Sequence, residues 1–264
     1  ANGTTGWANT AGGSGATTAT YTTGALTSTF YYRVRVTQTP NGCEVYSNAV
    51  PVFVATITTQ PVTPVAICVG GIVNISISAS LNGGTGSLSY QWQSNSGAGF
   101  VNETNGTATT ANFTSDVLNV TTQFRCLITS STTNCILTSN TVTATVVADP
   151  AISVQPTGGI VCSGGAFTLS VTGTGGTPSL NYQWYSSSDN ISFAQISGAT
   201  SSTYTTPALT QDTYYRVDVS ATGNGCGLVS SNSVLVNVIP DPVVNLQPVG
   251  NTICSGATHT MTVA

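Results

Sequence analysis

The stretch Tyr90-Gln91-Trp92 returns about 92 residues later as Tyr182-Gln183-Trp184. Each stretch lies in a short segment rich in aromatic and apolar residues, which is typical of a β-strand. In each, the tryptophan follows another aromatic residue in mid-strand, where a sandwich fold places a buried tryptophan. An internal repeat of this period predicts that the chain consists of similar units, each of which folds in the same way.

Further landmarks recur at offsets of about 91 to 95 residues. In chain order they are Gln60-Pro61, Gln155-Pro156 and Gln247-Pro248; Cys68-Val69-Gly70, Cys162-Ser163-Gly164 and Cys254-Ser255-Gly256; Tyr32-Arg33, Phe124-Arg125 and Tyr215-Arg216; and Ser47-Asn48, Ser139-Asn140 and Ser231-Asn232. The spacing predicts four segments: the C-terminal part of a repeat over 1–55, complete repeats over 56–148 and 149–240, and the N-terminal part of a further repeat over 241–264. We therefore expect the chain to be a piece of a longer array.

The pattern within each unit is that of short strands. Residues 73–78 alternate between apolar and polar side chains, and residues 142–146 and 234–238 are rich in β-branched residues. Glycine-rich turn clusters separate these runs, and no window shows apolar residues at helical spacing over three turns. About seven short strands in about 92 residues predict an all-β fold of tandem immunoglobulin-like β-sandwich repeats.

The predicted core is built on four aromatic residues of these strands: Trp92, Trp184, Phe124 and Tyr215. Two positions after the aromatic residue of the late strand, antibody domains carry a cysteine that bonds to the early strand. Here that position holds Cys126 in one repeat and Val217 in the other, and the early strand offers only Ile75 and Ile77. An antibody-type disulfide is therefore not expected, and Cys126 is predicted to be a buried free thiol.

Six of the seven cysteines recur at fixed positions of the repeat, which favours disulfides and an oxidising compartment. The default pairing lies within a repeat, Cys68 with Cys135 and Cys162 with Cys226, and leaves Cys43 and Cys254 without partners. In a sandwich, however, the two cysteines of one repeat are expected at opposite ends, about 20 Å apart, which is too far for a disulfide. The alternative is a bond between repeats, such as Cys68 with Cys226.

Composition excludes several classes of function. Only 5% of the residues are charged, with four arginines, no lysine, one histidine and a net charge of −4. So few cations cannot neutralise a nucleic-acid backbone. No nucleophile–base pair, paired carboxylates or Cys/His cluster recurs, so we expect no enzyme activity, no metal and no cofactor. Prolines interrupt the most apolar region, residues 50–73, so no membrane span is expected in this segment.

Two further sets of residues repeat with the unit. Arg33, Arg125 and Arg216 are expected on the outer face of a sheet and to pair across strands with acids, in the way that Glu44 lies opposite Arg35. The aromatic residues Trp7, Phe100 and Phe193 align roughly after the tryptophan-bearing strand. They are interpreted either as packing residues or as a surface for carbohydrate or protein binding.

Taken together, these motifs resemble those of a known family. Cys-x-Gly, Tyr-Gln-Trp, residues 197–204, residues 213–217 and Gly225-Cys226 resemble the immunoglobulin-like repeats of giant Bacteroidota (flavobacterial) cell-surface proteins. The resemblance implies export by the type IX secretion system and, for some members, a role as SprB-like gliding-motility adhesins. It also implies an extracellular, cell-surface location. The implied partners are neighbouring repeats, surface polysaccharide, and other cell-surface and secretion or motility proteins.

The function expected from repeat and resemblance together is a structural one. The chain is predicted to be a stalk or filament segment of a long adhesin that displays a distal tip for surface attachment or gliding motility. The alternatives are a carbohydrate- or protein-binding module and a spacer of a large secreted hydrolase.

Overall fold

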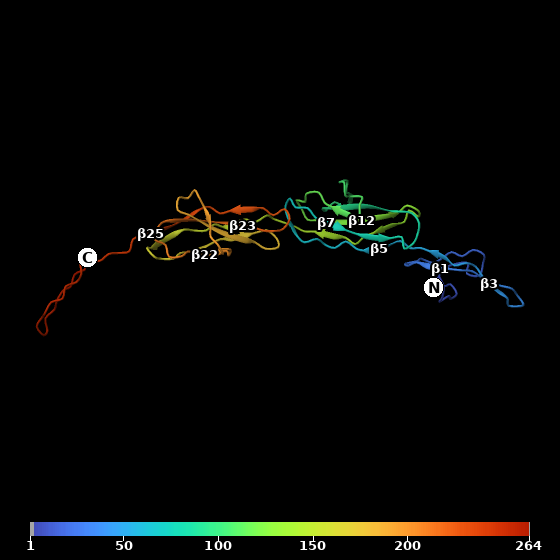
Figure 1. Ribbon diagram of the computed structural model, residues 1–264, viewed down its shortest axis with the longest axis horizontal. Coiled ribbons are helices and arrows are strands. Elements are labelled where there is room, and N and C mark those ends of the chain that lie inside the picture. The colour runs from blue at the N-terminus through green and yellow to red at the C-terminus, as the bar shows by residue number, and fades with distance from the viewer. Residues whose placement is uncertain (1–2, 264) are drawn as a thin grey trace. The chain divides into compact units, whose positions relative to one another are not determined.

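The computed structural model describes residues 3–263, which form strands, turns and loops and no helix. The chain divides into two compact units, one of residues 1–148 with 223–225 and one of residues 149–222 with 226–264 (Figure 1). We keep the ranges predicted from the sequence as names: residues 56–148 are the first repeat and residues 149–240 the second repeat. The all-β prediction is confirmed.

Residues 3–55 form two small antiparallel pairs. Their strands are β1 (Phe30–Tyr32), β2 (Arg35–Thr37), β3 (Glu44–Tyr46) and β4 (Val50–Val52), with β1 on β4 and β2 on β3. The predicted cross-strand ion pair is present, since Arg35 Nη1 lies 3.3 Å from Glu44 Oε1. Both side chains are substantially exposed, so the pair contributes at most about 1 kcal/mol.

The first repeat is a sandwich of two strand layers. Its strands are β5 (Thr56–Thr59), β6 (Ile67–Cys68), β7 (Asn74–Ser76), β8 (Ser78–Ser80), β9 (Leu88–Asn95), β10 (Val101–Asn102), β11 (Asn112–Thr114), β12 (Thr122–Ser130), β13 (Ile136–Thr138), β14 (Val142–Ala144) and β15 (Val146–Val147). One layer runs β10-β9-β12-β13, with β14 also on β12; the other holds the pairs β5–β8 and β7–β11. β15 pairs with β6 in parallel.

The second repeat has the same arrangement. Its strands are β16 (Ala151–Val154), β17 (Gly159–Cys162), β18 (Thr168–Ser170), β19 (Thr172–Thr174), β20 (Asn181–Ser187), β21 (Ala194–Gln195), β22 (Thr203–Thr205), β23 (Thr213–Ser220), β24 (Leu228–Ser230) and β25 (Val234–Ile239). One sheet runs β17-β25-β23-β20-β21 with β24 also on β23, and β16–β19 and β18–β22 form the other layer. Residues 241–263 contain no strand.

Each repeat has its own aromatic core around its tryptophan. In the first, Trp92 is fully buried and stacks on Phe113, which in turn contacts Phe124. In the second, Trp184 is fully buried and stacks on Tyr204, which contacts Tyr215. All four residues predicted for the core therefore lie between the layers. Each indole N–H donates a hydrogen bond at 2.9 Å to a backbone carbonyl, which satisfies its polar atom inside the core.

The recurring Ser-Asn motif forms the same hydrogen bonds each time. Ser139 Oγ accepts from the N–H of Cys126 and donates to the carbonyl oxygen of Asn140. Ser231 does the same with Val217 and Asn232 in the second repeat, and Ser47 with Val34 and Asn48 in residues 3–55. In the two complete repeats the serine thus satisfies the backbone N–H of Cys126 or Val217, at the point where one edge of the central strand changes its partner strand.

The Gln-Pro motif accepts a hydrogen bond from the Ser-Asn motif in each complete repeat. The N–H of Asn140 donates to Gln60 Oε1 at 3.0 Å, and the N–H of Asn232 donates to Gln155 Oε1 at 3.0 Å. Two landmarks about 80 residues apart in the sequence therefore meet in each repeat.

No helix within residues 3–263 is long and apolar enough to cross a membrane.

Candidate functional sites on the repeats

Arg125 and Arg216 lie on the outer face of β12 and β23, and all three recurring arginines are stacked against an aromatic ring. The guanidinium carbon of Arg125 lies 4.0 Å from the ring centre of Phe100, and that of Arg216 lies 4.7 Å from Phe193. Arg33 lies 4.3 Å from Trp7 and is also stacked on Tyr46. Such cation–π contacts contribute about 0.5–1 kcal/mol at exposed sites and more where water is excluded. The recurring arginines are thus stacked on aromatic rings, and within residues 3–263 only Arg35 forms an ion pair with a carboxylate.

The two complete repeats differ in what lies opposite the arginine across the strands. In the first repeat Gln93 faces Arg125, and Gln93 Oε1 accepts from Arg125 Nε at 2.8 Å. In the second repeat Tyr185 takes the glutamine's place opposite Arg216, with its ring centre 5.3 Å from the guanidinium. Arg216 Nε is buried there without a hydrogen-bond partner. In the second repeat the Tyr185 ring therefore takes the place of the hydrogen bond that Gln93 accepts in the first. Arg216 Nε is left as a buried polar atom without a partner.

These stacks bear on the proposed role of the aromatic residues in binding. Trp7, Phe100 and Phe193 are all half-buried, and a guanidinium covers one face of each ring. A sugar-binding platform needs an open ring face. The arrangement therefore favours the packing interpretation of these three residues over the binding interpretation.

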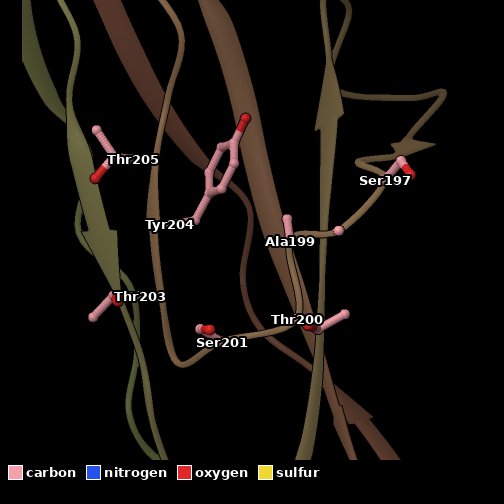
Figure 2. A pocket seen from close by; sticks show the side chains of 8 residues that line it. Ser197, Ala199, Thr200, Ser201, Thr203, Tyr204 and Thr205 are labelled. Carbon is pink, nitrogen blue, oxygen red and sulfur yellow. The ribbon is translucent and has the colours of Figure 1, made fainter.

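The second repeat carries a shallow hollow lined by small hydroxyl side chains. It measures about 200 Å³ and is formed by Ser197, Gly198, Ala199, Thr200, Ser201, Thr203, Tyr204 and Thr205. Figure 2 shows the Tyr204 ring standing among these residues on neighbouring segments of the chain. Desolvation raises the pKa of the Tyr204 phenol. The phenol therefore stays protonated near neutral pH and supplies no base.

Two carboxylates of the second repeat, Asp189 and Asp212, accept hydrogen bonds that fix the local backbone. Asp189 accepts from the N–H groups of Ser192 and Ile191 and from the hydroxyl of Ser187, and these bonds lower its pKa to about 2. Asp212 accepts from the amide of Asn237 and the N–H of Val238. Among residues 3–263, no group of three or more His, Cys, Asp or Glu side chains lies close enough together to hold a metal ion.

The pairing of cysteines within each repeat does not form. Cys135 and Cys162 are free and exposed, whereas Cys68 and Cys226 are each disulfide-bonded. The physical reason is that the two recurring cysteines of one repeat lie at opposite ends of the sandwich. The other two recurring cysteines that were candidates, Cys43 and Cys254, are free and exposed.

Cys126 is a buried free thiol, as its missing partner on the early strand predicted. Desolvation raises its pKa to about 11, so it remains a neutral thiol at physiological pH and is unsuited to act as a nucleophile. It packs in the first core at the position that Val217 occupies in the second.

Comparison with solved structures shows tandem immunoglobulin-like domains. The three N-terminal domains of the bacteriophage RB49 Highly Immunogenic Outer Capsid protein (Hoc) are similar over 79% of this chain and 78% of that one, with a TM-score of 0.51 and 12% identity. The I-band fragment I67–I69 from titin is similar over 74% of this chain and 69% of that one, with a TM-score of 0.46 and 17% identity. At 12% identity the likeness to the three capsid-protein domains shows the fold alone, and it confirms the predicted sandwich class.

Comparison of sequences identifies a family. No curated protein matches the chain. A family model described as Domain of unknown function (DUF8696) matches residues 1–56, 62–148 and 153–240, which together make up most of the chain. The chain therefore belongs to the family described as Domain of unknown function (DUF8696).

Proposed function

We propose that this chain is a spacer segment of an extracellular array of immunoglobulin-like repeats, a stalk that carries a distal domain away from a cell surface. The observation that carries the proposal is the repetition of one hydrogen-bonded frame. In both complete repeats, a buried tryptophan, a Ser-Asn motif and a Gln-Pro motif make the same bonds around separate cores. Units with separate cores are suited to lengthening an array without redesign.

The chemistry of the surface supports this role. Only 5% of the residues are charged, and the recurring arginines are stacked on rings. Salt screens interactions between exposed charges, so a surface with few of them keeps its properties when ionic strength changes. Such a surface suits a stalk exposed to a variable medium. Disulfide-bonded Cys68 and Cys226 fit the oxidising conditions outside the cell.

The finer assignment rests on the resemblance of the motifs. We propose that the array belongs to a long cell-surface adhesin exported by the type IX secretion system, with a role in surface attachment or gliding motility. Its partners would be neighbouring repeats of the same chain, surface polysaccharide, and other cell-surface and secretion or motility proteins. In this assignment the segment holds a distal tip domain away from the cell surface, and that tip makes the specific contact with the surface to which the cell attaches.

Immunogold electron microscopy of intact producing cells tests the proposal, with antibody raised against the full chain. Gold particles along thin filaments that project from the envelope are expected, and cells lacking the gene serve as the control. Label confined to released soluble material would overturn the stalk proposal and favour a spacer of a secreted hydrolase.

A further inference from the structure

The cysteine that begins the Cys-x-Gly motif lies at the C-terminal end of its repeat. In the first repeat, Cys68 of β6 is paired with Val147 of β15, next to the last residue of that repeat. In the second, Cys162 of β17 is paired with Ile239 of β25. In both, the first segment of the sandwich therefore carries its cysteine to the end where the chain leaves.

The late cysteine lies at the N-terminal end. In the first repeat the turn before Cys135 contacts the loop before β9, since Thr132 Oγ1 donates to the carbonyl oxygen of Thr85. Asn82 at the start of that loop donates to the carbonyl oxygen of Val54, where the chain enters the repeat. The whole length of β9, eight residues or about 26 Å, separates this end from the other.

The second repeat repeats this placement. Cys226 Sγ lies 3.8 Å from the carbonyl oxygen of Thr177. The neighbouring Gly176 is packed so closely that a Cβ there would lie 3.3 Å from Pro150, the residue before β16. A disulfide requires Cα atoms about 4.4–6.8 Å apart, so the two recurring cysteines of one sandwich cannot bond to each other.

A loop of the second repeat points to the partner of Cys68. Residues 223–225 belong to the same compact unit as the first repeat. The N–H of Cys68 donates to the carbonyl oxygen of Asn224 at 2.9 Å, and the N–H of Ile72 donates to Asn224 Oδ1 at 2.8 Å. Cys226 follows Asn224 by two residues, a span of at most about 7 Å. Cys68 and Cys226 are both disulfide-bonded, and every other cysteine among residues 3–263 is free.

We infer that each repeat is covalently linked to the next, from its Cys-x-Gly cysteine to the late cysteine of the following repeat. In this chain the link is Cys68 to Cys226. The four free recurring cysteines are the half-sites of further links, whose partners are repeats of the same kind: Cys162 and Cys254 each await a late cysteine, and Cys43 and Cys135 each await a Cys-x-Gly cysteine.

The backbone around the free recurring cysteines has the same conformation as the backbone around Cys68 and Cys226. After each Cys-x-Gly cysteine the chain turns back in the same way, with the N–H three residues on donating to the carbonyl oxygen of Cys68, Cys162 or Cys254 at 2.9–3.1 Å. The glycine inside each turn has a φ of +83° to +86°. Before each late cysteine, Gly42, Asn134 and Gly225 are likewise left-handed. The turns are therefore formed whether or not the bond is present.

The bond needs an oxidant, which an extracellular setting supplies, and to that extent the inference rests on the proposed function. Two thiols lose two protons and two electrons as one S–S bond forms. A small-molecule or protein disulfide takes up both, and its own S–S bond is cleaved to two thiols.

Peptide mapping of the purified full chain, oxidised with oxidised glutathione and alkylated under denaturing conditions, tests the inference. Trypsin cleaves after the four arginines and leaves the cysteines on residues 36–125, 126–216 and 217–264. We expect residues 36–125 to be linked to residues 217–264, with 126–216 unlinked, and five thiols to be alkylated. A link from 126–216 to either other peptide, or no link, would overturn the inference. The link should persist in Cys43→Ala and vanish in Cys68→Ala.

A lengthened chain tests whether the half-sites are used. If residues 149–240 are repeated once directly after residue 240, two cysteines are added. We still expect five thiols, because Cys162 of the first copy bonds to Cys226 of the second. Seven thiols would show that the half-sites stay empty and would contradict the inference. Both experiments use purified protein, so their failure would leave the surface location to be decided by microscopy.

Discussion

The first and second repeats share a hydrogen-bonded frame but fill it differently. Both keep the buried tryptophan with its N–H on a backbone carbonyl. Where the first repeat packs Phe124 and Cys126, however, the second packs Tyr215 and Val217. Cores tolerate exchanges that preserve volume, whereas a lost backbone hydrogen bond is costly at any volume. Residues that satisfy backbone hydrogen bonds are therefore common to both repeats, whereas residues that only fill space differ between them.

The largest expected effect follows from removing the residue that both repeats share. Trp92→Ala and Trp184→Ala should each lower the free energy of unfolding of their own repeat by about 3–5 kcal/mol, because each opens a cavity in a closed core. Denaturant unfolding of the reduced chain measures this. Trp7→Ala is the control, since Trp7 is half-buried, and it should cost far less. Equal losses in all three variants would contradict the account of the cores.

The next largest effect is the loss of the disulfide, and it should distinguish Cys68 from Cys162, which occupy equivalent positions in the two repeats. Cys68 is disulfide-bonded and Cys162 is free, so in the oxidised chain Cys68→Ala should lower stability by about 2–4 kcal/mol and Cys162→Ala should change it little. Thermal unfolding with and without reductant makes the comparison. Reductant should remove most of the difference. A difference that persists in reductant would mean that packing at Cys68, and no bond, causes it.

A third prediction distinguishes the cores by pH. Burial raises the pKa of Cys126 from its ordinary value of 9.0 to about 11. Burial, with a smaller contribution from Tyr204, raises the pKa of Tyr215 from 10.0 to about 12. A raised folded-state pKa means that the folded chain holds its proton more tightly. Stability is therefore complete below the unfolded value and is lost as pH rises through the folded one.

The first repeat should thus weaken from about pH 9 and the second from about pH 10, each by up to about 2–3 kcal/mol. Unfolding of the reduced chain followed between pH 8 and pH 12 measures both losses. Cys126→Val should abolish the loss in the first repeat. Tyr215→Phe should remove most of the loss in the second, and Tyr204, whose pKa burial also raises, should account for the remainder. If the pH dependence survived these substitutions, other groups would be responsible.

Sequence reasoning found the fold because the repeat and its strand periodicity depend on local pattern. Trp92 and Trp184 were identifiable as core residues because each follows an aromatic residue in mid-strand, where a sandwich places its buried tryptophan. The partners of Arg125 and Arg216 were wrongly expected to include acids, because cross-strand charge pairing is local whereas Phe100 and Phe193 reach the arginines from a separate segment. The Ser-Asn motif was noticed, but its bonds to a central strand and to a distant glutamine depend on tertiary structure.

The cysteines show the same limit. Cys68 and Cys135 share a repeat, which favours pairing by proximity in sequence, but strand direction places them at opposite ends of the sandwich. The length argument raised against that pairing was sound. It did not reveal the loop at Asn224, whose approach to Cys68 requires the fold of two repeats.

A smaller effect is expected at the Ser-Asn motif. Ser139→Ala and Ser231→Ala each leave a buried N–H, of Cys126 or Val217, without its acceptor and should cost about 1–2 kcal/mol in their own repeats. Denaturant unfolding measures the loss. Ser230→Ala is the matched control, because its side chain is exposed. A cost no larger than that of the control would show that water replaces the serine.

The smallest effect concerns the stacked arginines. A double-mutant cycle of Arg125→Ala with Phe100→Ala should give a coupling free energy of about 0.5–1 kcal/mol, because both side chains are only half-buried. The same cycle on Arg216 and Phe193 should give a similar value. A coupling free energy of zero in both repeats would contradict the stacking account and would favour the interpretation of Phe100 and Phe193 as binding residues.

Pulling single molecules of the full chain by its two ends tests most directly the claim that this is an array of separate sandwiches linked from one to the next. In reductant we predict two unfolding events, each releasing about 90 residues or about 300 Å of chain. In the oxidised chain a link from Cys68 to Cys226 should shield the residues between them, so that neither release of about 90 residues occurs. A single event in reductant, or equal extension in the oxidised and reduced chains, would contradict the account.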